Sequence, residues 1–471
     1  MKKRIYVMFE VKKRELEARL LFALIASSKG YSVVVANKAD IWARRYLLRP
    51  GIVICKSLGP GNINMVNDII EAGHEIVAWD EESLVTPYKI NYFIKRRISR
   101  ECLKKAKYFF SWGEIEHEYL TKEFSEYKEK LFKTGNSRID LFRNNNIKIF
   151  DDEANDLKNK YGEFCLLLGN FGRANNSYLK SFEDFVNGLI KEGTLKKDTK
   201  DFLHVKNSGI TQVEVFNEFP NIIEKFSKNF PNKKMIIRPH PVENIEPYKK
   251  MCKNFKNVIV VFDDRNVISW INAADFSISS NCTTSTESYL SKKLSINFWP
   301  FDDQDEAQMY LPTQVSLQAK STDELMKLIK KLYNENDFKI SKYLNTENIN
   351  KELKRAFYNF EPNVCSTSEI LKKLEKIEIK NFRKDIEVNF YLFYYYSLRS
   401  IIKKIIFPFL YLFRSKESKK WAHYVRNKNK GISYKGVKKK FLFLNNANKM
   451  QPNDFEVKEI IPRIFKIENI K

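Results

Sequence analysis

Three short polar clusters, each placed after an apolar run, carry the residues of this sequence that can do chemistry. They are the acidic run Asp80–Glu82, the run Arg238–Pro241 and the Ser/Thr-rich run 279–287. A carboxylate can take a proton, histidine and arginine can hold a phosphate, and hydroxyls beside free backbone N–H groups bind anions. Together the clusters predict a site that grips a nucleotide phosphate and deprotonates a hydroxyl group.

The acidic run Asp80, Glu81 and Glu82 follows the strand-like run HEIVAW. Three consecutive carboxylates repel one another, which is easier to understand if one is a general base whose pKa its neighbours raise. The alternative is a solvated acidic loop that caps the next helix.

The second cluster frames a histidine rigidly. Pro239 and Pro241 keep the backbone extended on both sides of His240 and so fix the direction of its ring. Such a histidine can donate a hydrogen bond or a proton to a departing phosphate, and Arg238 adds a fixed charge. The alternative is a structural histidine.

The Ser/Thr-rich run from Ser279 to Ser285, which includes Asn281, leads into a predicted helix with Glu287 one turn inside. Its hydroxyls and N–H groups can bind phosphate, and the carboxylate of Glu287 can accept from ribose hydroxyls. Such helix starts are common, so the value of this run lies in its place after His240. That spacing predicts that both lie at neighbouring strand ends.

The elements that position these clusters form two series of alternating strand and helix signals. In residues 1–150, a helical pattern over 14–30, ended by Gly30, separates the first two strand-like runs. This alternation predicts a parallel sheet with right-handed crossovers. The acidic, Asn-rich segment 144–160 is interpreted as an interdomain linker.

The second series occupies residues 151–335. It begins at FCLLLGN, whose Asn170 lines the predicted crevice or makes a turn, and passes through a long insertion. It ends at a predicted helix over 321–333, where Ser321 and Glu324 form a capping box. Neither series has G-x-G-x-x-G or a Walker A sequence, which argues against NAD and ATP. Residues 336–380 are expected to form a helical closing segment.

Composition sets outer limits. A chain of 471 residues with 43% hydrophobic residues predicts about two or three globular domains. The net charge of +25 indicates an anionic partner. A non-catalytic nucleic-acid-binding protein is the alternative of another class, but no basic stripe interleaved with aromatics occurs outside 381–471, so we expect no nucleic acid partner.

The cysteine pattern and the N-terminus indicate a cytoplasmic protein. The six cysteines include no C-x-x-C pair, which favours buried free thiols in a reducing compartment. The N-terminus has too few apolar residues for a signal peptide.

Residues 381–471 form a basic, aromatic tail. Within it, 390–416 is aromatic and aliphatic but contains Arg399, Lys403, Lys404 and Pro408, which argue against a spanning helix. Such a segment suits a helix in the headgroup layer of an anionic membrane, and the alternative is a core helix pair. The remainder, to Lys471, is expected to be loosely ordered or bound to a surface.

The order of the clusters resembles a known family. The acidic run, the His-Pro pair and the Ser/Thr cluster are similar to the three motifs of bacterial sialyltransferases and capsule Kdo transferases. More closely, KKRELEARLLFAL, HEIVAWDEESL, KTGNSRIDLF and the region from RPHP to NCTTSTE resemble the bacterial surface carbohydrate biosynthesis proteins. The resemblance covers roughly residues 1–335. It implies a GT-B fold, with two Rossmann-like domains facing a cleft.

The resemblance also assigns roles. It implies that Glu81 is the general base, with Asp80 and Glu82 as rivals, and that His240 holds the nucleotide phosphate. Contacts to the phosphate would come from Thr283, Thr284 and Ser285, and contacts to the ribose from Glu287. Ser83 stands where the family has glycine, so the register of the base stays open. In addition, Arg14, Arg19 or Lys56 can hold an anionic acceptor or a donor carboxylate.

The sequence therefore predicts an inverting glycosyltransferase that needs no metal or other cofactor. Its donor would be a CMP-activated 3-deoxy-2-keto acid sugar, either Kdo or a nonulosonic acid such as sialic, pseudaminic or legionaminic acid. Its acceptor would be a surface glycan or lipid-linked glycan at the inner face of the cell membrane. The alternatives are a CDP-glycerol-type polyol-phosphate transferase and a UDP-sugar epimerase. The prediction requires that Glu81 and His240 share one cavity.

Overall fold

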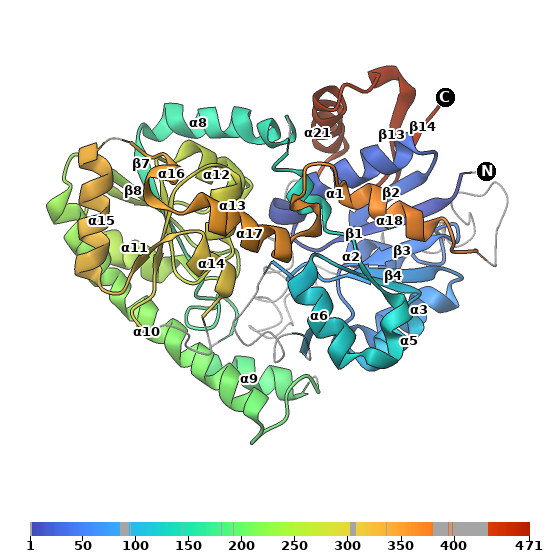
Figure 1. Cartoon of the computed structure of the whole chain (residues 1–471), viewed down its shortest axis with the longest axis horizontal. Coiled ribbons are helices and arrows are strands. Elements are labelled where there is room, and N and C mark those ends of the chain that lie inside the picture. The colour runs from blue at the N-terminus through green and yellow to red at the C-terminus, as the bar shows by residue number, and fades with distance from the viewer. Residues whose placement is uncertain are drawn as a thin grey trace. The chain divides into compact units, whose positions relative to one another are not determined.

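The computed structural model describes residues 2–84, 94, 96–143, 145–179, 181–191, 193–301, 308–335, 337–379, 394, 398 and 432–471. The chain forms two compact units, each built around its own sheet (Figure 1). The N-terminal unit comprises Met1–Ser83, Ile94–Asn146 and Lys354–Lys471, and the central unit comprises Leu84–Phe93 and Ile147–Leu353. The predicted α/β class with parallel sheets is confirmed, while the placement of the two units around a cleft stays a prediction.

The sheet of the N-terminal unit has the strand order β13-β14-β2-β1-β3-β4-β5-β6. The six strands from the first series are all parallel, as the alternation of strands and helices predicted. They are β1 (Arg4–Phe9), β2 (Ser32–Asn37), β3 (Ile52–Cys55), β4 (Glu75–Trp79), β5 (Tyr108–Ser111) and β6 (Leu131–Lys133).

Helix α1 (Lys12–Ser28) is largely buried, and it carries Arg14 and Arg19. It ends before Gly30, whose φ of +87° is the left-handed conformation of a helix C-terminus, as predicted. The other helices and 3-10 turns are α2 (Lys38–Ala43), Pro60–Asn62, α3 (Ile63–Glu71), α5 (Arg100–Lys105), α6 (Glu114–Glu123), Ser125–Lys130 and α7 (Ser137–Asp140).

The end of the chain completes this unit and corrects the expectation of a loosely ordered remainder. Residues 432–471 form α21 (Tyr434–Ala447), a turn at Pro452–Asp454, β13 (Phe455–Ile461) and β14 (Ile464–Asn469). β14 pairs antiparallel with β2, and α21 contacts α1. The reason is the apolar face of each element, because Val437, Phe441 and Phe465 are buried. Three lysines of α21 are exposed, namely Lys435, Lys438 and Lys439.

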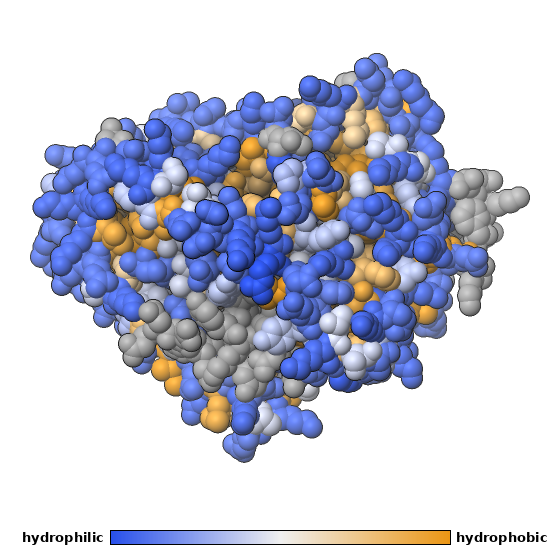
Figure 2. Space-filling view, viewed as in Figure 1, coloured by the Kyte–Doolittle hydropathy of each residue, from blue (hydrophilic) through white to orange (hydrophobic). Residues whose placement is uncertain are grey.

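The membrane prediction for 390–416 lies outside the described residues, apart from single positions. Within the described part of the chain, no helix combines the length and apolarity that a membrane crossing requires. Figure 2 shows a largely hydrophilic face on which apolar side chains gather in small groups. Most large apolar side chains are in the two cores instead.

The sheet of the central unit is entirely parallel, in the order β12-β11-β10-β7-β8-β9. From β7 the chain builds outward through β8 and β9, and then returns to place β10 on the other side of β7. The order therefore reverses between β7 and β10, where doubly wound sheets bind ligands. The strands are β7 (Phe164–Leu168), β8 (Lys234–Arg238), β9 (Val258–Val260), β10 (Ser277–Ser279), β11 (Ser295–Phe298) and β12 (Leu317–Ala319).

The predicted linker 144–160 is largely helical, as a 3-10 turn at Asn146–Phe150 leads into α8 (Asp151–Tyr161). Asp151, Asp152 and Glu153 occupy the first turn of α8, and Lys158 and Lys160 the last turn. This order of charges complements the helix dipole, and Ala154 and Leu157 join the core of the central unit. Most of the predicted linker is thus folded, and the boundary between the two units lies within it, between Asn146 and Ile147.

The remaining helices surround the central sheet and then return to the first unit. At α15, the Ser321 hydroxyl accepts from the N–H of Glu324, which confirms that half of the predicted capping box. The helices are α9 (Phe182–Lys191), α10 (Lys200–Asn229), α11 (Ile245–Cys252), α12 (Val267–Ala273), α13 (Thr284–Leu290), α14 (Tyr310–Gln314), α15 (Thr322–Glu335), α16 (Ile340–Tyr343), α17 (Thr346–Ala356), the 3-10 turn Tyr358–Phe360 and α18 (Ser366–Leu374).

All six cysteines are free thiols, and five of them are buried, which agrees with the cysteine pattern. Two of the buried thiols, Cys55 and Cys165, lie in the central strands of the two sheets. Burial raises the pKa of each of these two thiols to about 12, so they are unreactive components of the cores.

The added strand β14 gives a test of the fold. Phe465→Ala removes a fully buried ring from β14 and should lower the free energy of unfolding by about 3 kcal/mol. Ile470→Ala, at an exposed position just after β14, is the matched control and should change stability by about 0.5 kcal/mol or less. Urea unfolding measures both, and equal midpoints for Phe465→Ala and wild type would contradict the described role of β14.

Candidate functional site

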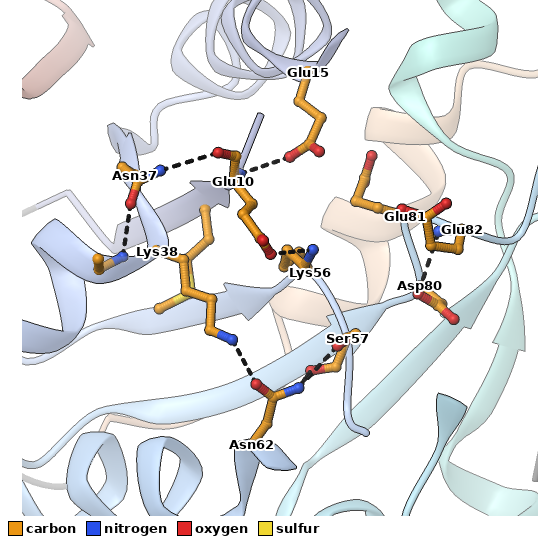
Figure 3. Close-up of polar contacts among 12 residues, drawn as sticks. Glu10, Glu15, Asn37, Lys38, Lys56, Ser57, Asn62, Asp80, Glu81 and Glu82 are labelled. Atoms are coloured by element: carbon orange, nitrogen blue, oxygen red, sulfur yellow. Dashed lines mark hydrogen bonds and ion pairs between the residues drawn. The ribbon is translucent and has the colours of Figure 1, made fainter. Parts of the chain in front are cut away.

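The carboxyl ends of β1, β3 and β4 meet at one edge of the N-terminal sheet and gather the charged residues that follow them (Figure 3). Glu10 follows β1, Lys56 follows β3, and the triplet Asp80–Glu82 follows β4. The Glu81 N–H donates to the Lys56 carbonyl at 3.0 Å, which carries the strand pairing into the loops.

Each carboxylate of the triplet has its own arginine. Arginine is well suited to this role because its guanidinium stays charged and donates several hydrogen bonds. The three arginines come from two distant segments, helix α1 and the segment before α5. The ion pairs are Asp80 with Arg97, Glu81 with Arg19, and Glu82 with Arg14.

The members of the triplet differ in their access to solvent. The side chains of Glu81 and Arg19 are both 0% exposed, and among the described residues the Oε2 atom of Glu81 has no hydrogen-bond partner. Arg138 Nη1 lies 4.0 Å from that atom. The side chain of Glu82 is 29% exposed and is held by Arg14 at 2.8 Å. In this conformation, Glu82 is therefore the more accessible carboxylate of the two.

The predicted elevation of a carboxyl pKa in the triplet is wrong for Glu82. Burial acts to raise the pKa of Glu82, but the charges of Arg14, Arg97 and Lys56 outweigh burial and place this pKa below its usual range. The sequence showed three neighbouring negative charges, whereas the fold surrounds them with cations.

Arg14, Arg19 and Lys56, named from the sequence as possible anion ligands, all lie at this edge. Arg14 also bonds Glu15 at 3.0 Å, and Lys56 pairs with Glu10. The Arg14 side chain is 26% exposed, whereas that of Arg19 is fully buried. Arg14 is thus the better placed of these two arginines to meet a bound anion.

The polar edge continues toward β2 in residues that sequence reasoning missed. Lys38 Nζ donates to Asn62 Oδ1 at 2.5 Å, and Asn62 Nδ2 donates to Ser57 Oγ at 2.9 Å (Figure 3). These residues were missed because the sequence places them in three separate loops or helix starts.

Glu116, on the first turn of α6, is a second missed carboxyl group. It accepts from Ser83 Oγ and from the Trp112 N–H, each at 2.7 Å. Burial raises the pKa of Glu116 to about 8, so this group is mostly protonated at neutral pH. Ser83 stands where the resembled family has glycine. Its hydroxyl was the available sequence signal that a hydrogen-bond acceptor was nearby.

The run KTGNSRIDLF (133–142) contacts the acidic triplet and holds it in place. Asn136 caps α7 by accepting from the Arg138 N–H at 3.0 Å, and Arg138 donates to the Glu81 carbonyl at 3.3 Å. Asp140 accepts from the Ser366 N–H at 3.1 Å and from the Ser366 hydroxyl at 2.6 Å. The motif therefore positions the triplet and fastens α18 to the same unit.

In the central unit, Asn170 and Asn281 meet where the strand order reverses. Asn170 Nδ2 donates to the Asn281 carbonyl at 3.1 Å, across the ends of β7 and β10. Asn281 has a φ of +49°, and its side chain accepts from the Met309 N–H at 2.6 Å. Both residues thus shape the crevice, while contact with a nucleotide stays a prediction.

His240 lies two residues beyond β8, between its two prolines. Its Nδ1 accepts from the Val242 N–H at 3.3 Å, so in the neutral ring Nε2 carries the proton and acts as a donor. One expectation is corrected, since β8 and β10 are not adjacent but flank β7 on opposite sides. His240 and Asn281 therefore lie on either side of the end of β7.

Arg238, the last residue of β8, is buried. It donates to the Arg265 carbonyl at 2.8 Å. Burial lowers the pKa of Arg238, and the negative charges of Asp263 and Glu287 oppose that shift. Arg238 therefore lies within electrostatic reach of Glu287, which joins the second and third clusters.

The Ser/Thr cluster divides into an inward and an outward part. Ser285 is fully buried, within 2.8 Å of Ser279 Oγ and 3.1 Å of Ser295 Oγ, so its hydroxyl is not presented to a phosphate. The cause is the helical turn, which directs Ser285 toward β10 and β11. Thr283 and Thr284, at the start of α13, are partly exposed. The hydroxyl oxygen of Thr284 is nevertheless buried and, among the described residues, has no hydrogen-bond partner.

Each group is fixed within its own unit, and the common cavity of Glu81 and His240 stays a prediction. In the described part of the chain, no group of three or more His, Cys, Asp or Glu side chains is arranged to hold a metal ion.

No protein-family model matches the sequence, and no curated protein sequence matches it significantly. Among solved structures, the chain is similar to the UDP-GlcNAc 2-epimerase from Methanocaldococcus jannaschii, with 14% identity, 80% of this chain and 99% of that chain covered, and a TM-score of 0.46. The UDP-GlcNAc 2-epimerase from Neisseria meningitidis is 11% identical, with 80% of this chain and 100% of that chain covered and a TM-score of 0.47. The wall teichoic acid polymerase TagF is 11% identical, with 79% of this chain and 88% of that chain covered and a TM-score of 0.45. With TM-scores below 0.5, these likenesses carry no argument about fold or activity.

Proposed function

We propose that this chain is a nucleotide-sugar glycosyltransferase whose central unit binds the nucleotide and whose N-terminal unit binds the acceptor. The observation that carries the proposal is His240, held between two prolines at a strand end beside the reversal of strand order, with Nε2 as its donor atom. A neutral N–H donor suits a phosphate oxygen, and the nearby Arg238 adds positive charge. Doubly wound sheets bind their ligands at this kind of edge.

The proposed donor is a CMP-activated 3-deoxy-2-keto acid sugar. Its single phosphate carries less negative charge than a diphosphate does. One neutral histidine donor and one arginine at this strand end match that smaller charge. The sugar also carries a carboxylate, and Arg14 offers a partly exposed guanidinium for it. The proposal needs no metal, because His240 and Arg238 stabilise the departing phosphate.

In the proposed reaction, the acceptor hydroxyl oxygen attacks C2 of the sugar while the bond from C2 to the CMP phosphate breaks. The electron pair of that bond leaves with CMP, and the hydroxyl proton passes to a carboxylate of the enzyme. His240 Nε2–H donates a hydrogen bond to the phosphate as its charge increases. Attack opposite the leaving group inverts the configuration at C2.

We assign the proton-accepting role to Glu82 rather than to Glu81, because Glu82 is the more exposed of the two. Arg14 lowers the pKa of Glu82 in the free enzyme. When a donor carboxylate binds Arg14, it shares this positive charge, and the pKa of Glu82 rises toward its ordinary value. Donor binding would thereby activate the base. Glu81 can serve only if Arg19 releases it.

A second candidate is a UDP-sugar epimerase, and Glu116 is the observation that favours it. Its pKa of about 8 makes it a proton donor at neutral pH close to the carboxylates of the triplet. An epimerase that eliminates and re-adds its nucleotide needs both an acid and a base. The CDP-glycerol-type transferase has no comparable observation in its favour.

We further propose that the acceptor is a surface glycan or lipid-linked glycan, and that the chain works at the inner face of the cell membrane. The support is the basic and aromatic composition of 390–416. An acceptor fixed in a membrane requires an enzyme that is held beside it.

Nucleotide preference separates the two candidates. We expect CMP to raise the melting temperature more than CDP or UDP at equal concentration. A ligand that binds more tightly stabilises the folded state more, and the proposed site prefers CMP. Following CMP release from a panel of CMP-sugars then identifies the donor. A clear preference for UDP, with release of no CMP, would favour the epimerase and overturn the proposed donor.

Replacement of the two glutamates tests the assignment of the base. Glu82→Gln should reduce kcat by roughly a thousandfold, the usual scale of general-base catalysis, while CMP affinity stays near that of the wild type. Glu81→Gln is the matched control, and it should lower the free energy of unfolding by about 3 kcal/mol because it leaves Arg19 buried without its charge partner. Full turnover by Glu82→Gln would show that another carboxylate takes the proton.

A further inference from the structure

Glu243, three residues after His240, is buried beneath the two loops that frame the predicted phosphate site. Its side chain accepts from the Phe171 N–H at 2.8 Å and from the His240 N–H at 3.3 Å, both at Oε1. Its Oε2 accepts from the Tyr248 hydroxyl. Glu243 itself is only 3% exposed. One carboxylate thus joins the loop after β7, the loop after β8 and helix α11.

The two loops are also fastened through their backbones. The Ser177 N–H donates to the Val242 carbonyl at 2.9 Å, and the Asn244 N–H donates to the Asn175 carbonyl at 3.0 Å. Asn175 Nδ2 returns a hydrogen bond to the Asn244 carbonyl at 2.8 Å. The loop that follows β7 and the loop that carries His240 therefore act as one body.

Two glycines leave the space that the carboxylate and its loop occupy. A Cβ atom at Gly169 would lie 2.7 Å from Glu243 Oε2 and 2.9 Å from the Tyr248 hydroxyl. A Cβ atom at Gly172 would lie 2.5 Å from Val242 Cγ2. The sequence keeps glycine where a side chain would push Glu243 or its loop out of place.

The surroundings of Glu243 offer it no cation among the contacts described above. Burial raises the pKa of Glu243 to about 7, while the hydrogen bonds from Tyr248, Phe171 and His240 act in the opposite direction. The titratable groups that face it are Tyr248 from α11, His240 from its own loop and Cys282 from the loop after β10. Neither Tyr248 nor Cys282 is charged at neutral pH, since burial raises the pKa of each.

We propose that Glu243 is the positioning residue of the phosphate site, and that its buried side chain holds the loops after β7 and β8 so that His240 Nε2 faces the nucleotide. The inference rests on the proposed function only in naming a nucleotide as the ligand. Loss of the proton leaves a buried charge that opening of the loops would hydrate. The loop that carries His240 therefore loosens as Glu243 ionises.

The stability of the fold should show the cost of keeping this carboxylate ionised. The folded-state pKa of about 7 lies above the ordinary value of 4.5, so the contribution of Glu243 to stability is complete below 4.5 and is lost as the pH rises through 7. The ionised form is thus the one that favours opening of the two loops.

Hydrogen exchange of the two loops tests the inference without a ligand. In the wild type, the protection of peptides covering 169–177 and 239–245 should rise at least twofold, after correction for intrinsic rates, as the pH falls from 8 to 6. In Glu243→Gln, whose side chain does not titrate, this rise should be lost. Glu246→Gln, at an exposed position of α11, is the matched control and should behave as the wild type does.

Tyr248→Phe keeps the shape of the ring and removes one donor that favours the carboxylate, so it should move the midpoint of the pH dependence upward. If Glu243→Gln fails to fold, the midpoint of the pH dependence in Tyr248→Phe tests the inference in its place. Protection that is independent of pH in the wild type, or a midpoint that Tyr248→Phe leaves unchanged, would overturn the inference.

Titration with CMP at pH 6, where Glu243 is mostly protonated, separates this inference from the proposed function. We expect Glu243→Ala to weaken CMP binding at least tenfold, Glu243→Gln to weaken it less, and Glu246→Gln to leave it unchanged. If the wild type binds CMP and Glu243→Ala binds it equally well, the positioning role fails and the proposed function stands. If the loops respond to pH as described but no nucleotide binds the wild type, the proposed function fails, and with it the nucleotide named here.

Discussion

The buried ion pair between Glu81 and Arg19 constrains the whole N-terminal unit. Neither side chain is exposed, so each charge depends on the other, and loss of either would leave an uncompensated charge in the interior. The pair ties the end of β4 to the middle of α1, a helix that also packs on β1, β2 and β14. Arg14, less than two turns earlier on the same helix, is thereby brought to Glu82. The arrangement of the polar edge follows from this one contact.

In the central unit, backbone N–H groups and a hydroxyl, rather than a cation, hold the buried side chain of Glu243. Glu243 is about as buried as Asp80 and Glu81. Its pKa of about 7 contrasts with that of Glu82, which its arginine partner holds below its usual range. Glutamate therefore has two roles, as an arginine-paired charge at the polar edge of the N-terminal sheet and as a titratable support beside His240.

The sequence allowed the strand ends to be predicted because they depend on local patterns. Apolar runs followed by WDEES, RPHP and NCTTSTE located Glu82, His240 and Asn281 at sheet edges, and the parallel pairing confirmed that logic. Partners distant in the chain could not be predicted in this way. Arg19 was named only as a possible anion ligand and not as the partner of Glu81, and Glu116 was missed. Ser285 faces inward because the phase of a short helix decides its direction. The hairpin of β13 and β14 was missed because its lysines concealed its apolar alternation.

The segment 390–416, proposed to bind a membrane, belongs to the N-terminal unit. The segment 375–433 follows α18 and precedes α21, and both of these helices contact α1. Lys440 of α21 pairs with Glu17 of α1, and Lys29, just after α1, bonds Ser368 of α18 at 3.1 Å. Figure 1 shows α18 and α21 within the N-terminal unit. The two helices that flank this segment therefore both pack on the helix that carries Arg14 and Arg19. If 390–416 binds a membrane as proposed, the unit held beside that membrane is the one to which the proposed reaction assigns the acceptor.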